Sequence, residues 1–345
     1  MTEYNIAVVG AGVVGKEMLR VLAEHRFPAR DIKVLARSAR TLTVDGREYQ
    51  VKLTTPEAFE GVQIALFAGT EGEKGAAVTF GPEAVRRGAV IIDNGADFRM
   101  RPDVPLVVPE VNAAALQTHE GIVANPNCST AQLVLALKPL HDLATITRVW
   151  IATYQAVSGA GGAAVEELTA QNEALSEGRA ITGPGPAFPV QIAANVIPQI
   201  GGFDDAGYTS EEMKLVGETR KIMGEPGLRV TPIVAARVPV LVGHSEAVCV
   251  ETVRPVTPAE ARALWAGAPG VAVLDDRNGA DPYHAYPTPL FAAGKDTTFI
   301  GRIRQDLDNP HGLNFWIVSD NLRKGAATNA VQIAESLVAQ GLLRR

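Results

Sequence analysis

Residues 124–132, with the sequence Ala-Asn-Pro-Asn-Cys-Ser-Thr-Ala-Gln, are the part of the chain best suited to chemistry. A short apolar strand precedes them, a proline stiffens the turn, and an apolar helix follows. Ser129 and Gln132 have the spacing of a capping box, which predicts that Ser129 begins the helix. Cys128 would then lie at the positive end of a helix dipole, where the thiolate is favoured over the thiol.

A thiolate in that position can attack a carbonyl carbon, and the neighbouring amide of Asn127 can support the oxyanion that forms. The alternative is a buried structural cysteine, which is the usual role of a lone cysteine. Chain position alone does not decide between these two interpretations. Cys249, the second of the 2 cysteines, lies in an alternating strand pattern and is predicted to be inert.

A glycine-rich turn at the start of the chain is the second chemical signal. Gly10, Gly12 and Gly15 fit G-x-G-x-x-G, with Val13 and Val14 between the last two glycines. The turn lies between a predicted strand and a predicted helix, so its N–H groups can approach a pyrophosphate at the helix N-terminus. This context predicts a dinucleotide site, although such a turn can also simply pack a helix against a sheet.

The residues after the second predicted strand indicate which dinucleotide is bound. An NAD site usually places an acidic residue there to accept from the ribose 2′-hydroxyl, but this chain has Arg37, Ser38 and Arg40. Guanidinium groups match a 2′-phosphate, so NADP(H) is favoured over NAD. The alternative is a pair of solvated surface arginines.

Periodicity predicts the elements that must position these groups. The first third alternates short apolar strands with helices, which indicates a doubly wound, Rossmann-like α/β domain. Its strands are expected at 5–9, 32–36, 64–68, 90–93 and 122–124, with a helix at 13–23 and a hairpin at 43–53 around Asp45-Gly46.

The pattern changes after about residue 131, where strands become longer and richer in β-branched residues. An α+β catalytic domain with a mostly antiparallel sheet is expected over 131–324. The NADP-binding domain is expected to comprise 1–130 and a returning amphipathic helix at 325–345. The catalytic strands are predicted at 146–154, 230–237, 246–253, 299–304 and 315–320, with helices at 162–175 and 211–223 and a loop at 182–189.

Bulk properties exclude several classes of protein. The chain has 345 residues, which suggests two domains, and its formal net charge of -6 argues against a nucleic-acid surface. The N-terminus lacks the basic start of a signal peptide, and no apolar run is long enough to span a bilayer. Two distant cysteines favour a reduced cytoplasmic compartment, and no His/Cys/carboxylate grouping predicts a metal.

The 125–130 sequence, Asn-Pro-Asn-Cys-Ser-Thr, resembles the nucleophile motif of the aspartate-semialdehyde dehydrogenases. Further similarities follow in the family's order at 93–100, 107–112, 153–161, 211–214, 218–222, 237–239, 243–246 and 320–325. The resemblance implies reduction of L-4-aspartyl phosphate by NADPH, through a thioester on Cys128, to L-aspartate 4-semialdehyde and phosphate. This step belongs to the biosynthesis of lysine through diaminopimelate and of threonine, methionine and isoleucine.

The same resemblance implies a role for each site residue. His244 is the implied general acid/base, Gln155 positions the substrate, Arg237 holds its α-carboxylate and Glu211 lies near its α-ammonium group. A neutral-range pKa suits histidine to that role, and a guanidinium fork suits a carboxylate. Taken singly, these side chains could equally be solvated or structural. The resemblance also implies a phosphate site formed by Arg99, Asn127 and Lys214. It implies further cofactor contacts from Ser158, Gly159 and Asn321.

The resemblance further implies a catalytic domain similar to that of glyceraldehyde-3-phosphate dehydrogenase, which joins a homodimer or homotetramer. The chain departs from the family in its glycine turn, which is one residue shorter, and at Gly69-Thr70-Glu71-Gly72, where small Ser/Gly residues are usual. The alternatives are an N-acetyl-glutamyl-phosphate reductase, whose nucleophile motif resembles Pro-Gly-Cys-Tyr, and a non-catalytic NADP-binding sensor. A redox-sensing thiol protein would need a resolving cysteine near Cys128.

Overall fold

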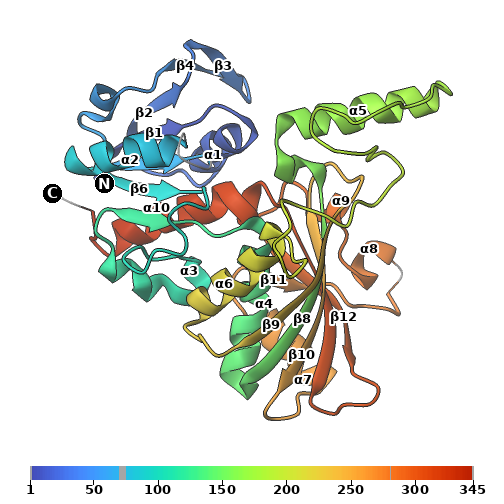
Figure 1. Ribbon diagram of the computed structural model, residues 1–345. Coiled ribbons are helices and arrows are strands. Elements are labelled where there is room, and N and C mark those ends of the chain that lie inside the picture. Colours follow the sequence, from blue (N-terminus) through green and yellow to red (C-terminus); the bar gives the residue numbers. More distant parts are fainter. Residues whose placement is uncertain (1, 70–74, 280, 344–345) are drawn as a thin grey trace. The chain divides into compact units, whose positions relative to one another are not determined.

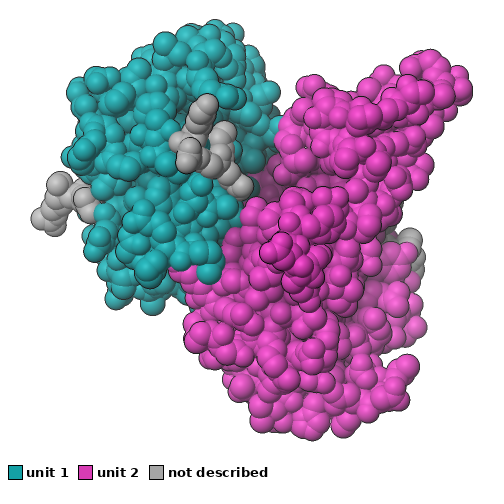
Figure 2. Space-filling model, viewed as in Figure 1, with its two compact units in different colours: residues 1–127, 326–345 teal, residues 128–325 magenta. Residues whose placement is uncertain are grey.

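The computed structural model describes residues 2–69, 75–279 and 281–343. The chain divides into two compact units, which Figure 2 colours separately. Unit 1 comprises residues 1–127 and 326–345, and unit 2 comprises residues 128–325. No helix of the described part is long and apolar enough to cross a membrane.

Unit 1 is built on a seven-stranded sheet with the order β3-β4-β2-β1-β5-β6-β7 (Figure 1). All its strand pairs are parallel except the β3–β4 hairpin. The short apolar segments that were predicted to be strands of a doubly wound domain therefore do form a mostly parallel sheet. The strands are β1 Tyr4–Val9, β2 Ala29–Ala36, β3 Arg40–Val44, β4 Arg47–Leu53, β5 Ile64–Phe67, β6 Val90–Asp93 and β7 Ile122–Ala124.

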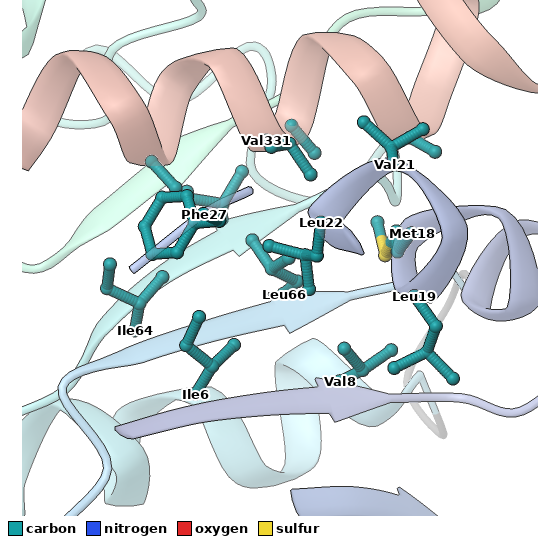
Figure 3. Close-up of a cluster of buried hydrophobic side chains, with 14 of the residues drawn as sticks. Ile6, Val8, Met18, Leu19, Val21, Leu22, Phe27, Ile64, Leu66 and Val331 are labelled. Atoms are coloured by element: carbon teal, nitrogen blue, oxygen red, sulfur yellow. The ribbon is translucent and has the colours of Figure 1, made fainter. Parts of the chain in front are cut away.

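Helices cover both faces of this sheet because neighbouring strand residues point to opposite faces. Ile92 of β6 belongs to a core cluster with α1 (Val13–Glu24) and α10 (Thr328–Ala339). Ile91 points the other way, against α2 (Ala76–Arg86). Figure 3 shows Val331 of the C-terminal helix beside the α1 side chains and the sheet.

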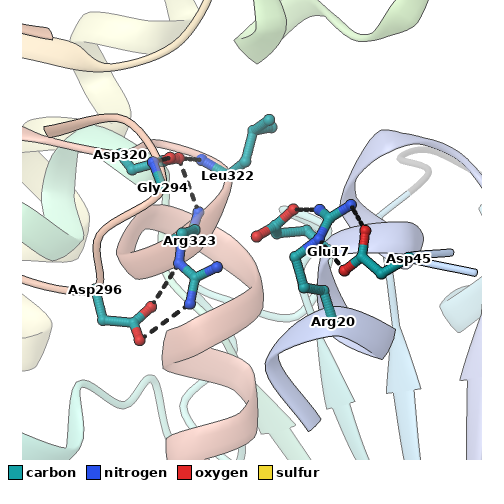
Figure 4. A network of polar contacts seen from close by, with 8 residues as sticks. All are labelled: Glu17, Arg20, Asp45, Gly294, Asp296, Asp320, Leu322 and Arg323. Carbon is teal, nitrogen blue, oxygen red and sulfur yellow. Dashed lines mark hydrogen bonds and ion pairs between the residues drawn. The ribbon is translucent and has the colours of Figure 1, made fainter. Parts of the chain in front are cut away.

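The predicted hairpin is confirmed, and its turn chemistry is visible. Asp45 and Gly46 have φ values of 47° and 79°, which is the left-handed pair that a tight two-residue hairpin turn requires. Arg20 of α1 donates to both oxygens of Asp45, at 2.7 and 3.0 Å, and also pairs with Glu17 (Figure 4). This ion-pair network holds the hairpin against the first helix.

Unit 2 contains a six-stranded sheet with the order β11-β12-β13-β10-β8-β9. The three central pairs are antiparallel and the two outer pairs are parallel, so the expected mostly antiparallel α+β unit is confirmed. The short edge strand β11 was not predicted. The strands are β8 Ile146–Gln155, β9 Arg229–Arg237, β10 His244–Thr252, β11 Val271–Val273, β12 Thr298–Gln305 and β13 Gly312–Ser319.

One face of this sheet packs against three helices, α4 (Cys128–Ala144), α6 (Ser210–Met223) and α7 (Pro258–Ala266). Trp265 of α7 packs at a tilt against Phe315 of β13 and donates its indole N–H to the Ala136 carbonyl of α4. The remaining described α-helices of this unit are α5 (Gly162–Ser176) and the short α8 (Pro282–Ala285) and α9 (Pro289–Ala292).

Two helix starts differ from their predictions. Helix α4 begins at Cys128, so Ser129 lies inside the first turn and is not the cap. Ser129 and Gln132 have the spacing of a capping box, but the helix begins one residue earlier than that spacing implied. Capping boxes occur instead on α6, where Thr209 and Glu212 bond reciprocally, and on α7, where Thr257 and Glu260 do the same.

The helix expected over 325–345 also begins later. Arg323–Ala327 form a π-helical turn, and the α-helix runs only over Thr328–Ala339. Asp320 accepts from the N–H groups of Leu322 and Arg323 at 2.8 and 3.1 Å and from Gly294, while Arg323 pairs with Asp296 (Figure 4). These bonds fix the turn that follows β13, so that strand ends at Ser319.

Candidate active site

Three of the candidate residues come together as a row at one end of the unit 2 sheet. Strand register pairs Gln155 of β8 with Arg237 of β9. It also pairs Ser245 with Tyr154, which places His244 of β10 beside Gln155 on the other side. Because residues directly opposite share a face, all three side chains lie on the face that α4 covers. All three are buried.

The main chain of Ala156 holds two of these side chains at once. Its N–H donates to Nδ1 of His244 at 3.0 Å, and its carbonyl accepts from Nη1 of Arg237 at 2.7 Å. An Nδ1 atom that accepts carries no proton, so the neutral ring carries its proton on Nε2. His244 is therefore presented as an N–H donor at Nε2, which has no hydrogen-bond partner within the described part of the chain.

The electrostatics support a neutral imidazole. Burial lowers the pKa of His244 well below its ordinary value, and the positive charge of Arg237 lowers it further. Burial also lowers the pKa of Arg237, while the charges of Cys128 and Glu211 raise it. By reciprocity the Arg237 cation favours the thiolate form of Cys128.

Cys128 is the first residue of α4, where the N–H groups of the first turn and the helix dipole favour negative charge. Its thiol is half-exposed and is not in a disulfide. Gly325 packs directly against it, since a Cβ atom built at Gly325 would lie 2.7 Å from that of Cys128. A side chain at 325 would push the nucleophile out of place.

A second set of polar bonds surrounds Gln155. Its amide donates to Oε1 of Glu211 at 3.0 Å and to Oγ1 of Thr153 at 3.3 Å. The other Glu211 oxygen lies 3.5 Å from Nζ of Lys214, three residues along the same helix. Glu211 is thus a buried carboxylate between an amide and a cation, with Gln155 linking it to the row.

Ser158, Gly159 and Asn321 lie close to His244. Nδ2 of Asn321 donates to the Ser158 hydroxyl at 3.0 Å, and Oδ1 of Asn321 accepts from the Gly243 N–H at 2.8 Å. A Cβ atom at Gly159 would lie 2.9 Å from Nη1 of Arg237 and 3.1 Å from Nε2 of His244. Only glycine leaves this edge of the imidazole open.

The other two candidates for a phosphate site belong to unit 1. Asn127 is the residue before Cys128 and is buried. Arg99 donates from Nε to the Asn125 carbonyl at 2.9 Å and from Nη2 to the Asn94 carbonyl at 2.6 Å. Arg99 is thereby fixed beside the segment that leads to the nucleophile.

The glycine turn of unit 1 has the geometry that a pyrophosphate needs. Gly10 has a φ of 108°, which favours glycine, and a Cβ atom at Gly15 would lie 1.8 Å from the Gly10 carbonyl oxygen. Gly12 has open space at the corresponding point. The turn is tight, the helix packs closely on it, and its middle glycine faces space that a phosphate can enter. These features fit a dinucleotide despite the shorter turn.

The second departure from the family lies mostly outside the described residues. Gly69 is described and has a φ of 82°. Thr70, Glu71 and Gly72 belong to the part of the chain that the structure does not describe.

Arg37, Ser38 and Arg40 follow β2 and are exposed. Arg40 donates to the Ser38 hydroxyl at 3.1 Å and to the Ala11 carbonyl of the glycine turn at 3.3 Å. Its guanidinium group therefore reaches from the first residue of β3 back to the glycine turn.

Replacing Arg37 and Arg40 together with glutamine should raise the KM for NADPH about ten- to hundredfold, because charge-assisted bonds to the 2′-phosphate are lost. The KM for NADH should change little. Steady-state kinetics with both cofactors checks this, with Arg47→Gln, an exposed arginine stacked on Tyr49, as the control. Equal weakening of both cofactors would instead assign the pair to the pyrophosphate or to the fold.

Sequence reasoning missed three features of the site. The main chain of Ala156 leaves no sequence signal because any residue supplies the same N–H and C=O groups. The contact of Gly325 with Cys128 joins distant positions. Glu246 and Gln132, both buried near the row, had a weak signal: each is a polar residue on the buried face of an apolar element.

Two family models match the chain. The model for the semialdehyde dehydrogenase NAD binding domain matches residues 5–119, and the model for the semialdehyde dehydrogenase dimerisation domain matches residues 137–324. Together with the Rossmann-like unit 1 and the Cys128 site of unit 2, these matches define the class as a nicotinamide-dependent semialdehyde dehydrogenase. The predicted fold class is thereby confirmed.

Comparison with individual relatives identifies the family within this class. The aspartate-semialdehyde dehydrogenase of Aquifex aeolicus is 47% identical over 99% of both chains, and that of Bacillus subtilis is 48% identical over 96% of this chain and 97% of its own. The crystal structure of aspartate semialdehyde dehydrogenase II from Vibrio cholerae matches with a TM-score of 0.91 and 43% identity, covering 98% of this chain and 99% of that one. The chain belongs to the aspartate-semialdehyde dehydrogenase family, as its motifs predicted.

Proposed function

We propose that this chain reduces L-4-aspartyl phosphate to L-aspartate 4-semialdehyde and phosphate with NADPH. The observation that carries the proposal is the arrangement in unit 2 of a cysteine at a helix N-terminus and a buried row of Arg237, Gln155 and His244. A related Vibrio cholerae structure is described as complexed with ASA. No observation favours an N-acetylated substrate or a non-catalytic role.

In the first step the Cys128 thiolate attacks the acyl carbon. The C–S bond forms, the C–O bond to phosphate breaks, and the phosphate leaves with the electron pair and takes up one proton from solvent. The thiolate is favoured by the N-terminus of α4 and by the Arg237 charge. The product is a thioester on Cys128.

In the second step the thioester carbon accepts a hydride, which NADPH supplies when bound. The carbonyl oxygen then becomes an alkoxide, and Nε2–H of His244 is the donor that can stabilise it. Collapse of the alkoxide breaks the C–S bond, releasing the aldehyde and restoring the thiolate. The role of His244 in this step is that of a neutral donor.

The substrate's charged groups fit the side chains around the row. Arg237 has a guanidinium fork for the α-carboxylate, although one of its nitrogens is already bonded to Ala156. Glu211 offers a buried carboxylate for the α-ammonium group. Gln155, which bonds Glu211, is suited to hold the reacting chain beside the thiol. Arg99, Asn127 and Lys214 are the proposed phosphate ligands.

We assign NADP(H) binding to unit 1 and catalysis with dimerisation to unit 2. The dinucleotide contacts proposed are the 10–15 turn, the arginines after β2, and Ser158, Gly159 and Asn321 of unit 2. A family description of unit 2 as a dimerisation domain supports a homodimer, or a homotetramer built from it. A cytoplasmic location accords with two cysteines that form no disulfide with each other.

The direct test is a phosphate-dependent assay of the reverse reaction. NADPH formation from aspartate semialdehyde and NADP should require phosphate and follow its concentration. The same chain should not act on N-acetyl-glutamate semialdehyde at a comparable rate. Turnover of the acetylated substrate alone would overturn the assignment.

The Arg237→Lys variant tests how the substrate is held. Lysine keeps the charge but cannot form the planar fork, so the substrate shifts relative to Cys128. A displacement of about 1 Å near the reacting carbon costs on the order of a hundredfold in rate. We expect that loss in kcat/KM for aspartate semialdehyde, with normal NADP affinity in a fluorescence titration.

Arg229→Lys is the matched control, since Arg229 lies at the opposite, exposed end of β9. It should leave kcat/KM unchanged. An Arg237→Lys enzyme with unimpaired kcat/KM would mean that the carboxylate is held elsewhere.

A further inference from the structure

Glu246 lies two residues beyond His244 on β10, so both side chains point to the same face of the sheet. It is fully buried, and neither carboxyl oxygen has a hydrogen-bond partner of normal geometry in the part of the chain that the structure describes. An isolated carboxylate in such a place is costly. Burial raises the pKa of Glu246 well above its ordinary value.

Gln132 approaches the same carboxyl group from α4. It lies one helical turn beyond Cys128, so the two residues share a face of the helix. Its side chain is buried, and its amide is the neighbouring group that lowers the pKa of Glu246. Nε2 of Gln132 has no hydrogen bond of normal geometry to any described residue, so the amide is near the carboxyl group without such a bond to it.

Two layers of side chains therefore lie between α4 and the sheet. The outer layer consists of Cys128 and His244, the first residues of α4 and β10. The inner layer consists of Gln132 and Glu246, which lie on the same faces, four residues along α4 and two residues along β10. On the neighbouring strand, Thr153 is paired directly with Glu246 and accepts from the Gln155 amide. The inner layer thus adjoins the residues that line the outer one.

We propose that Glu246 is a positioning residue, whose carboxyl group meets the Gln132 amide between β10 and α4 and so sets the place of the Cys128 thiol relative to His244. A carboxylic acid and a primary amide each offer a donor and an acceptor and can form a reciprocal pair. An ionised carboxylate lacks the donor. The reciprocal pair therefore requires the neutral acid, which burial favours.

The measurement of kcat in this test rests on the proposed function. The measurement of Cys128 alkylation needs no substrate and is independent of that function. The variants are Glu246→Gln, which keeps a donor and an acceptor, and Glu246→Leu, which keeps volume without either. Val248→Ala is the matched control, because Val248 is the next buried residue on the same face of β10. All are made in a Cys249→Ser background, and each variant's melting temperature is measured first.

Two experiments are then compared: steady-state kinetics, which give kcat and KM in the phosphate-dependent assay, and iodoacetamide alkylation of Cys128, whose rate is measured across pH. Glu246→Gln should retain most of the wild-type kcat and the wild-type alkylation profile. Glu246→Leu should lose about ten- to hundredfold in kcat with KM little changed, as misplaced groups do. Its alkylation should be slower and should reach its half-maximum at a higher pH.

Several results would overturn the proposal. If Glu246→Gln loses as much kcat as Glu246→Leu, the ionised form is required and Glu246 acts as a base. If Glu246→Leu alkylates as the wild type does, or Val248→Ala loses as much kcat for the same loss of melting temperature, the carboxyl group serves packing alone. A wild-type chain inactive in the assay would count against the proposed function, while the alkylation comparison would still decide the role of Glu246.

Discussion

Replacing Cys128 with serine should leave a folded protein that binds NADPH but loses more than about a thousandfold in kcat, the scale on which covalent nucleophiles act. A neutral hydroxyl cannot replace a thiolate that the helix N-terminus and Arg237 favour. The measurements are steady-state kinetics in the phosphate-dependent assay and a fluorescence titration with NADPH. Unchanged cofactor affinity would show that the loss is in chemistry.

The second cysteine of this chain supplies the control. Burial raises the pKa of Cys249, and the charges of Asp306 and Glu251 raise it further. The thiolate is therefore less favoured at Cys249 than at Cys128, and Cys249→Ser should keep full activity. Mass spectrometry after brief exposure to iodoacetamide should find Cys128 labelled much faster. Equal labelling of both cysteines, or an active Cys128→Ser enzyme, would refute the thioester mechanism.

The His244→Asn variant should lose roughly 10²–10⁴-fold in kcat while its KM stays close to that of the wild type. The ring is fixed as an Nε2–H donor by the Ala156 N–H at Nδ1, and asparagine is too short to place a donor at the same point. The loss falls on the step in which charge develops on the substrate oxygen. A variant with raised KM and normal kcat would show that His244 only binds substrate.

The lowered pKa of His244 also predicts how stability depends on pH. Below about pH 6.5 the unfolded chain binds a proton on this histidine, whereas the folded chain does not. The unfolded state then binds more protons, so the free energy of unfolding decreases as pH falls, by at most about 1.4 kcal/mol per pH unit.

The His244→Asn variant lacks this term, so acidification from pH 7 to 5 should destabilise the wild type more than the variant. Denaturant unfolding of both proteins at the two pH values measures the difference, because their other titrating groups are the same. A parallel decrease in both proteins would mean that the folded state takes up the proton readily. The neutral donor assigned to His244 would then be wrong.

Much of unit 1 follows from local patterns. The glycine spacing of 10–15, the Asp45-Gly46 hairpin and the short apolar strands each depend on contacts between neighbouring residues, and short-range sterics fix such structure. The same holds for Cys128 at a helix N-terminus, although the helix start was displaced by one residue. Resemblance supplied the roles that no local pattern could.

What the sequence by itself determined is therefore the identity of the reactive groups and the kind of element that carries each one. Only the tertiary structure decided how they meet. His244 and Ala156 are 88 positions apart, yet one backbone N–H fixes which ring nitrogen carries the proton. The burial that raises the pKa of Glu246 also comes from α4 packing on strands far along the chain. Strand pairing and burial are long-range properties, because they depend on which distant segments share a sheet and not on the residues beside them.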